Sequence, residues 1–130
     1  MRQWMVDPRY MCDRHLLGEH VEHHMFVGTI NKGTSIQGYI DNNLLEPKSL
    51  KDRHLAIATE MIRRGMNHKT DLPQCNIERL SEENRKAKID RDRSFQDLMS
   101  RCPKCREKKE QNDRVMECIE RQKNANNQVY

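Results

Sequence analysis

The sequence has few aromatic residues and no long apolar stretch. Aromatic side chains make up 5% of the 130 residues and all hydrophobic residues together 35%, so any core must be small. No segment approaches the roughly 18 consecutive apolar residues of a membrane-spanning helix. The N-terminus also lacks the charged, apolar and small-residue regions of a signal peptide. We therefore expect one intracellular, cytoplasmic domain that does not associate with membranes.

A strong excess of one charge is also absent. Charged residues form 34% of the chain, yet the net charge is only +4. This mild basic balance permits nucleic-acid binding without establishing it. The five cysteines are an odd number in a chain without a secretory signal. They are typical of reduced thiols or metal ligands and argue against a disulfide framework.

Two helices are predicted in the first half of the chain from apolar residues at helical spacing. The first begins at Asp7 or at Asp13, because aspartate is a good helix N-cap, and ends near residue 32. Gly33 follows and suits the left-handed conformation that ends many helices. The second helix begins near Ser49 and ends at Gly65 for the same reasons.

The remaining segments are more polar. Residues 33–47 are rich in glycine, asparagine and aspartate, which favours a loop or a short strand-like excursion, and residues 67–73 form a polar connector. Charged helical segments are expected at residues 81–99 and at about 104–121, before an asparagine-rich tail that should fray. These elements predict an all-α fold, a compact single-domain helical bundle. We expect an N-terminal arm, anchored by Trp4, to pack between the helices.

Histidines and carboxylates are concentrated near the start of the first predicted helix. Helical spacing places His15, Glu19 and Glu22 on one stripe. Such a stripe could bind a divalent metal, act as general acid and base, or form an ordinary polar face. Its spacing differs from the His-Glu-x-x-His of zinc proteases, so we expect no catalytic zinc. Chemistry alone leaves either Glu22 or Glu19 as an acid/base group or as a structural residue.

Cys102 and Cys105 have Cys-x-x-Cys spacing, which lets two thiolates reach one tetrahedral ion. A second such pair is missing from the sequence. Cys75 or Cys118 could supply further ligands, but single pairs are often ordinary thiols. We therefore assign no metal and no cofactor from the sequence.

Basic residues from several segments could form a phosphate-binding rim if the N-terminus and the first two helices meet. The alternative is that they only promote solubility. These residues are Arg2, Lys32, Arg53, Arg63, Arg64, His68 and Lys69.

Several short pieces of the N-terminal half keep one register with a known family. The pieces are Met1-Arg2, His15-Leu16, residues 19–22, Val27-Gly28 with Lys32, and residues 63–67. They resemble the pyrimidine-dimer DNA glycosylase/AP lyase family, of which the phage endonuclease V of pyrimidine-dimer repair is the known type. The resemblance covers about the first seventy residues. The alignment has no gap from the first residue to Lys32 when the family's N-terminal residue is aligned with Met1.

The resemblance implies a catalytic mechanism. In this family an N-terminal α-amine attacks C1′ of the damaged nucleotide, displaces the base and forms a Schiff base that eliminates and nicks the strand. The resemblance aligns Met1 with the family's nucleophile and Glu22 with its catalytic glutamate. The glutamate would stabilise the cationic sugar and move protons. An α-amine suits imine chemistry, because its ordinary pKa of about 7.7–8.0 lies well below the roughly 10.4 of lysine. Arg2 should prevent removal of Met1.

Two departures from the family concern DNA contacts. Val21 and Met25 stand where the family has DNA-contacting arginines. The aromatic, basic C-terminal segment of the family enzyme is replaced here by the Cys102–Cys105 turn and a segment of mixed charge. The resemblance therefore leaves the choice of lesion open.

The sequence thus predicts a DNA glycosylase with AP lyase (β-elimination) activity on damaged double-stranded DNA such as pyrimidine dimers, acting as a monomer. Residues 1–75 would form the glycosylase-like catalytic core. Residues 76–130 would form a charged helical C-terminal part of the same domain. The predicted site residues are Met1 and Glu22 for catalysis and Arg2, His15 and Lys32 for DNA binding. Two alternatives are a non-catalytic nucleic-acid- or protein-binding module on the same fold and a metal-dependent nuclease built on the histidine-glutamate stripe.

Overall fold

The computed structural model describes residues 1–68 and 70–127, and these residues form helices joined by irregular segments, without a strand. The predicted all-α fold is confirmed. None of the described helices is both long and apolar enough to cross a membrane. In chain order the elements are η1 (Pro8–Tyr10), α1 (Asp13–Asn31), α2 (Gln37–Asp41), η2 (Pro47–Ser49), α3 (Leu50–Arg63), η3 (Ile77–Arg79), α4 (Glu82–Arg85), α5 (Arg91–Arg101) and α6 (Pro103–Asn127).

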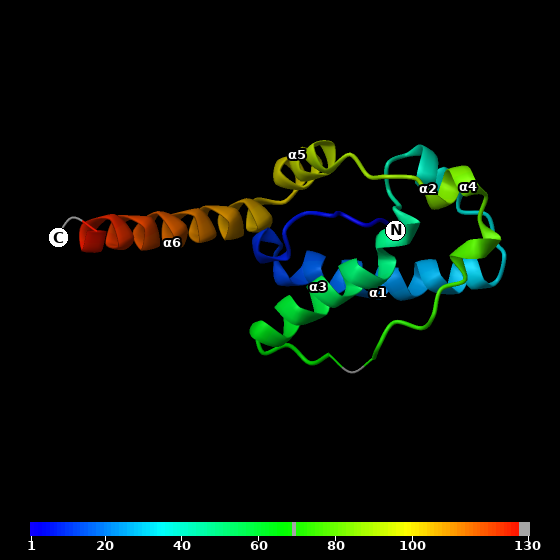
Figure 1. Cartoon of the computed structure of the whole chain (residues 1–130), viewed down its shortest axis with the longest axis horizontal. Helices are drawn as coiled ribbons and strands as arrows, with labels where there is room; N and C mark the ends of the chain where they lie inside the picture. The colour runs from blue at the N-terminus through cyan, green and yellow to red at the C-terminus, as the bar shows by residue number, and fades with distance from the viewer. Residues whose placement is uncertain (69, 128–130) are drawn as a thin grey trace.

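Helices α1 and α3 pack against each other at the centre of the molecule (Figure 1). The helical spacing is right for part of each apolar face, since Leu16 and Phe26 on α1 and Ile57 on α3 are completely inaccessible. Other apolar residues of the two helices are exposed, namely Leu17, Val21, Leu55 and Ile62. Both helices end where expected. Gly33 and Gly65 follow them with φ of +76° and +79°, a left-handed conformation that costs glycine little.

The N-terminal arm runs between the α1–α3 pair and α5 (Figure 1). Trp4 is buried as predicted, with 8% of its surface exposed, and belongs to a core cluster that includes Leu16 of α1, Ile57 of α3 and Leu98 of α5. The Ser94 hydroxyl on α5 donates a hydrogen bond to the carbonyl of Trp4. The arm is therefore held from both sides, which confirms the expectation that it packs between helices.

The segment predicted as a loop or strand-like excursion is instead partly helical. Helix α2 occupies its centre, and Gln37 donates a hydrogen bond to Asp41 one turn later, at 2.8 Å. Ile36, buried to 2% exposure, anchors the start of this short helix in a second core cluster with Phe26 and Leu50. Tertiary burial thus outweighs the weak helix propensity of the polar residues.

The helices of the C-terminal part begin and end at other residues than predicted. The expected helix at residues 81–99 is divided into α4 and α5, because Ile89 is buried between them and Asp90 then caps α5 by accepting the Arg93 N–H at 3.1 Å. Helix α6 is longer than predicted and extends away from the rest of the molecule (Figure 1). It remains helical through Asn127, where fraying was expected, and the last three residues of that tail lie outside the described residues.

Candidate active site

The polar stripe of α1 does not assemble into one site. Its members face different parts of the molecule, and each has its own partners. His15 lies beside a group of cysteines, Glu19 pairs with a buried arginine, and Glu22 contacts the start of the chain. A metal centre built from all three is therefore not formed in this structure.

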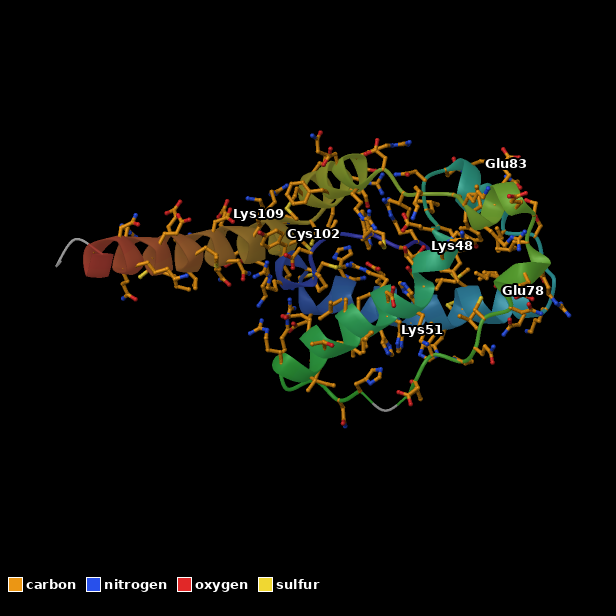
Figure 2. All side chains as sticks on the ribbon, viewed as in Figure 1. Lys48, Lys51, Glu78, Glu83, Cys102 and Lys109 are labelled. Atoms are coloured by element: carbon orange, nitrogen blue, oxygen red, sulfur yellow. The ribbon has the colours of Figure 1, made fainter. Side chains whose placement is uncertain are left out.

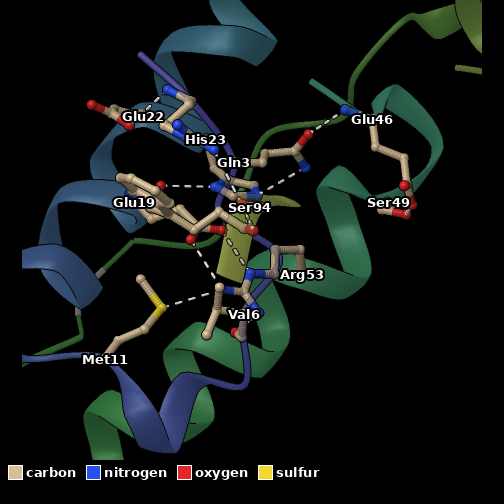
Figure 3. Close-up of polar contacts among 12 residues, drawn as sticks. Gln3, Val6, Met11, Glu19, Glu22, His23, Glu46, Ser49, Arg53 and Ser94 are labelled. Atoms are coloured by element: carbon tan, nitrogen blue, oxygen red, sulfur yellow. Dashed lines mark hydrogen bonds and ion pairs between the residues drawn. The ribbon is translucent and has the colours of Figure 1, made fainter. Parts of the chain in front are cut away.

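Glu22 contacts the first peptide of the chain. The backbone N–H of Arg2 donates a hydrogen bond of 3.0 Å to Oε2 of Glu22 (Figure 3). Glu22 and Met1 are both half-buried, so each keeps some access to solvent. A carboxylate thus lies one peptide away from the terminal amine. A carboxylate at this position can exchange protons with an amine and stabilise a cation beside it.

A buried hydrogen-bond chain fixes the arm next to this contact (Figure 3). Gln3, which is completely buried, accepts the Glu46 N–H at 2.5 Å, and its amide nitrogen lies 3.3 Å from Nε2 of His23. Nδ1 of His23 lies 2.7 Å from the Glu19 carbonyl, which can only accept, so Nδ1 carries the proton and Nε2 accepts from Gln3. Burial lowers the pKa of His23 to about 4, which agrees with a neutral ring.

The side chain of Arg2 turns towards α5. Its guanidinium carbon lies 3.7 Å from the centre of the Trp4 ring, and Nη2 donates to the hydroxyl of Ser94 at 3.1 Å. Asp97 lies 3.8 Å from Nη1. Burial is the main cause that lowers the pKa of Arg2. These contacts position the start of the chain, while the DNA contact expected of Arg2 stays a prediction.

Glu19 has a structural partner. Arg53 on α3 makes two hydrogen bonds to its carboxylate, at 2.6 and 3.0 Å, and a third to the Val6 carbonyl at 2.6 Å (Figure 3). Because both side chains are buried, Glu19 is not available as an acid/base group. The hypothesis that Arg53 belongs to a phosphate-binding rim is wrong for the same reason. Only the spatial pairing of two helices identifies this role.

The other predicted rim residues are dispersed. Lys32 is exposed at the C-terminal end of α1. Arg63 and Arg64 both pair with Glu60, and Lys69 lies outside the described residues. Val21 and Met25, in place of the arginines of the family, are about half exposed at 47% and 50%. The α1 surface beside Glu22 is therefore partly apolar.

A cluster of histidines lies between α1, α3 and the connector after α3. Nε2 of His20 and Nε2 of His54 are 3.0 Å apart, and the His68 ring centroid is 4.8 Å from that of His20. Burial, together with the neighbouring imidazoles, lowers the pKa of His20 and of His54 to about 4. This cluster is not evident from the sequence, because His54 and His68 are distant from α1 in the chain.

These pKa values predict a loss of stability in mild acid. The folded pKa of about 4 lies below the ordinary value of 6.5, so the unfolded chain binds protons first as the pH falls. The free energy of unfolding should therefore decrease between pH 6.5 and about 4 and change little from these groups above pH 7. Urea unfolding across this range measures the effect. The variant His54→Gln should show a shallower dependence, and an unchanged slope in that variant would rule out a contribution from His54.

Comparison with known proteins places the chain in a family. A family model described as pyrimidine dimer DNA glycosylase matches residues 1–74. No curated protein and no solved structure matches the chain. The matched residues contain the arm, α1 and α3, and thus the contact between Glu22 and the start of the chain. Because the match covers more than half of the sequence, the chain belongs to the pyrimidine dimer DNA glycosylase family, whose substrate is DNA.

Proposed function

We propose that this protein is a DNA glycosylase with AP lyase activity and that the α-amine of Met1 is its nucleophile. The observation that carries the proposal is the hydrogen bond from the Arg2 N–H to Glu22, which holds a carboxylate one peptide away from the amine. Family membership supports the glycosylase class. The resemblance in register from Met1 to Glu22 supports the lyase step.

The reaction proceeds in two stages. The lone pair of the Met1 amine forms a bond to C1′ while the glycosidic C1′–N bond breaks, and the base leaves with a proton. The sugar ring opens to an imine. Removal of a C2′ proton then breaks the C3′–O bond, which releases the strand as a phosphate leaving group, and water later hydrolyses the imine. Glu22 would stabilise positive charge at C1′ and carry the protons between these steps.

The fold supports this chemistry by fixing the amine. Gln3 is locked by the buried chain to His23 and Glu46, and Arg2 is held by Trp4 and Ser94. A nucleophile must approach its carbon within a narrow range of positions, so a rigid arm favours attack. The contacts of Arg2 with α5 also support one domain that includes residues 76–130. We expect this domain to act as a monomer on damaged double-stranded DNA.

Borohydride trapping on an abasic duplex tests the nucleophile. The trapped adduct should map to Met1 by mass spectrometry, and acetylation of the terminus should abolish trapping. A one-residue N-terminal extension moves the amine by up to about 3.6 Å and should also abolish it. Lys32→Arg is the control and should trap normally. An adduct on an internal lysine, with Met1 free, would contradict the proposal.

Cleavage of the same abasic duplex also tests the two alternatives, a metal-dependent nuclease and a non-catalytic binding module. Cleavage that persists in EDTA is expected here, whereas a metal-dependent nuclease would lose activity. Binding without any cleavage or trapping would instead identify a non-catalytic module.

DNA binding is expected to depend on phosphate contacts by basic residues such as Lys32. The variant Lys32→Ala should reduce the slope of log affinity against log salt by about 0.9, the value for one lost phosphate contact. Fluorescence anisotropy with an undamaged duplex at several salt concentrations measures this slope. Lys123→Ala, on the projecting helix α6, removes the same charge and should leave the slope unchanged. Equal slopes for the wild type and Lys32→Ala would exclude this contact.

A further inference from the structure

Four side chains from distant parts of the sequence converge where the start of α1 meets the junction of α5 and α6. They are Cys12, His15, Cys102 and Cys105, and their potential ligand atoms all lie within 4.8 Å of one another. Figure 2 shows Cys102 at this junction. The three cysteines are buried and His15 is half-buried. All three thiols are free of disulfides.

The distances fit a tetrahedral ion. A zinc ion lies about 2.3 Å from sulfur and about 2.0–2.1 Å from nitrogen, so tetrahedral ligands should be about 3.8 Å apart for two sulfurs and about 3.5 Å for sulfur and nitrogen. Sγ of Cys12 and Sγ of Cys102 are 3.8 Å apart. Nδ1 of His15 lies 3.2 Å from Sγ of Cys12 and 3.7 Å from Sγ of Cys105. These three distances are close to the values that the ion would require.

The backbone around the cluster favours thiolates. Cys12 is the N-cap of α1, and Cys102 immediately precedes α6, so both sulfurs lie near the positive ends of helices. The Cys12 N–H points at Sγ of Cys105, at 3.2 Å, and the Cys105 N–H points at Sγ of Cys102, at 3.4 Å. Such N–H donors stabilise the negative charge of a metal-bound sulfur.

We propose that Cys12, His15, Cys102 and Cys105 bind one structural Zn²⁺ through three thiolates and Nδ1 of His15. Four protein ligands complete a tetrahedron, which leaves no open position for substrate and marks a structural site. The ion would join the start of α1 to the α5–α6 junction. His15 would then be a metal ligand and not a DNA contact.

The cysteines considered as partners from the sequence lie elsewhere. Cys75 packs against the second core cluster, near Phe26 and Leu50, and Cys118 is exposed on α6. The two ligands that complete the proposed site, Cys12 and His15, form a Cys-x-x-His pair at a helix start. The sequence contained that signal, but only the fold brings it to Cys102.

Metal content of the full-length protein tests the proposal. Wild-type protein refolded with zinc should bind one equivalent of zinc per chain, as measured by mass spectrometry. Cobalt in its place should give a thiolate-to-metal charge-transfer band and the intense visible bands of a tetrahedral ion. Cys105→Ser should lose the zinc and the charge-transfer band, whereas Cys118→Ser should keep both. His15→Cys should restore the zinc that His15→Gln loses.

Two further measurements keep the test decisive. If Cys105→Ser does not fold, a chelator should lower the melting temperature of the wild type, and added zinc should restore it. His54→Gln controls for the histidine cluster, which offers no thiolate and should not affect the band. A wild type that binds no zinc, a cobalt spectrum without thiolate charge transfer, or zinc lost only in His54→Gln would each overturn the proposal.

Discussion

The Glu22→Gln protein should bind duplex DNA about as tightly as the wild type and cleave it roughly 10²- to 10⁴-fold more slowly. Glutamine keeps the length of the side chain and an oxygen that can accept the Arg2 N–H bond, so the arm should stay in place. It cannot carry negative charge or transfer a proton near neutral pH. The loss should therefore affect the chemical step and leave the binding step intact.

Single-turnover cleavage of a duplex with one abasic site, combined with anisotropy binding, separates these two steps. Glu83→Gln is a matched control, since it removes the same charge from an exposed position on α4 (Figure 2). Its cleavage rate should equal that of the wild type. If Glu22→Gln retained more than about a tenth of the wild-type rate, Glu22 would have no acid/base role in the mechanism.

Replacement of Arg53 by methionine should lower the free energy of unfolding by about 3–5 kcal/mol. The substitution leaves Glu19, which is 1% exposed, as a buried charge without its counter-ion. It also removes the donor that holds the Val6 carbonyl. Urea denaturation at neutral pH measures the change from the midpoint and slope of the transition.

A double variant isolates the cause of this loss. Glu19→Met combined with Arg53→Met removes both charges, so most of the stability should return, because a buried ion pair contributes little beyond apolar side chains of similar volume. Arg63→Met, on the same helix but 64% exposed, is the control and should cost at most about 1 kcal/mol. A double variant as unstable as the sum of the single variants would show that the charges are not coupled.

Local patterns determined much of this fold. The C-terminal ends of α1 and α3 follow from apolar spacing and from Gly33 and Gly65, because helix periodicity and helix termination depend on neighbouring residues. The start of α1 was open between Asp7 and Asp13, and the structure places it at Asp13 with Cys12 as the N-cap. The burial of Trp4 and the family register from Met1 to Glu22 were also visible in the sequence. Such features need no knowledge of which segments meet in space.

Tertiary contacts decided what each side chain of the α1 stripe does. Glu19, Glu22 and His15 share one helical face, but their partners come from α3, from the start of the chain and from the α5–α6 junction respectively. In the sequence, all three are titratable residues at helical spacing, and that pattern does not distinguish their roles. The difference arises only because the helix packs against three different segments, and burial next to Arg53 turns one carboxylate into a structural ion pair while the other remains half-buried beside the first peptide.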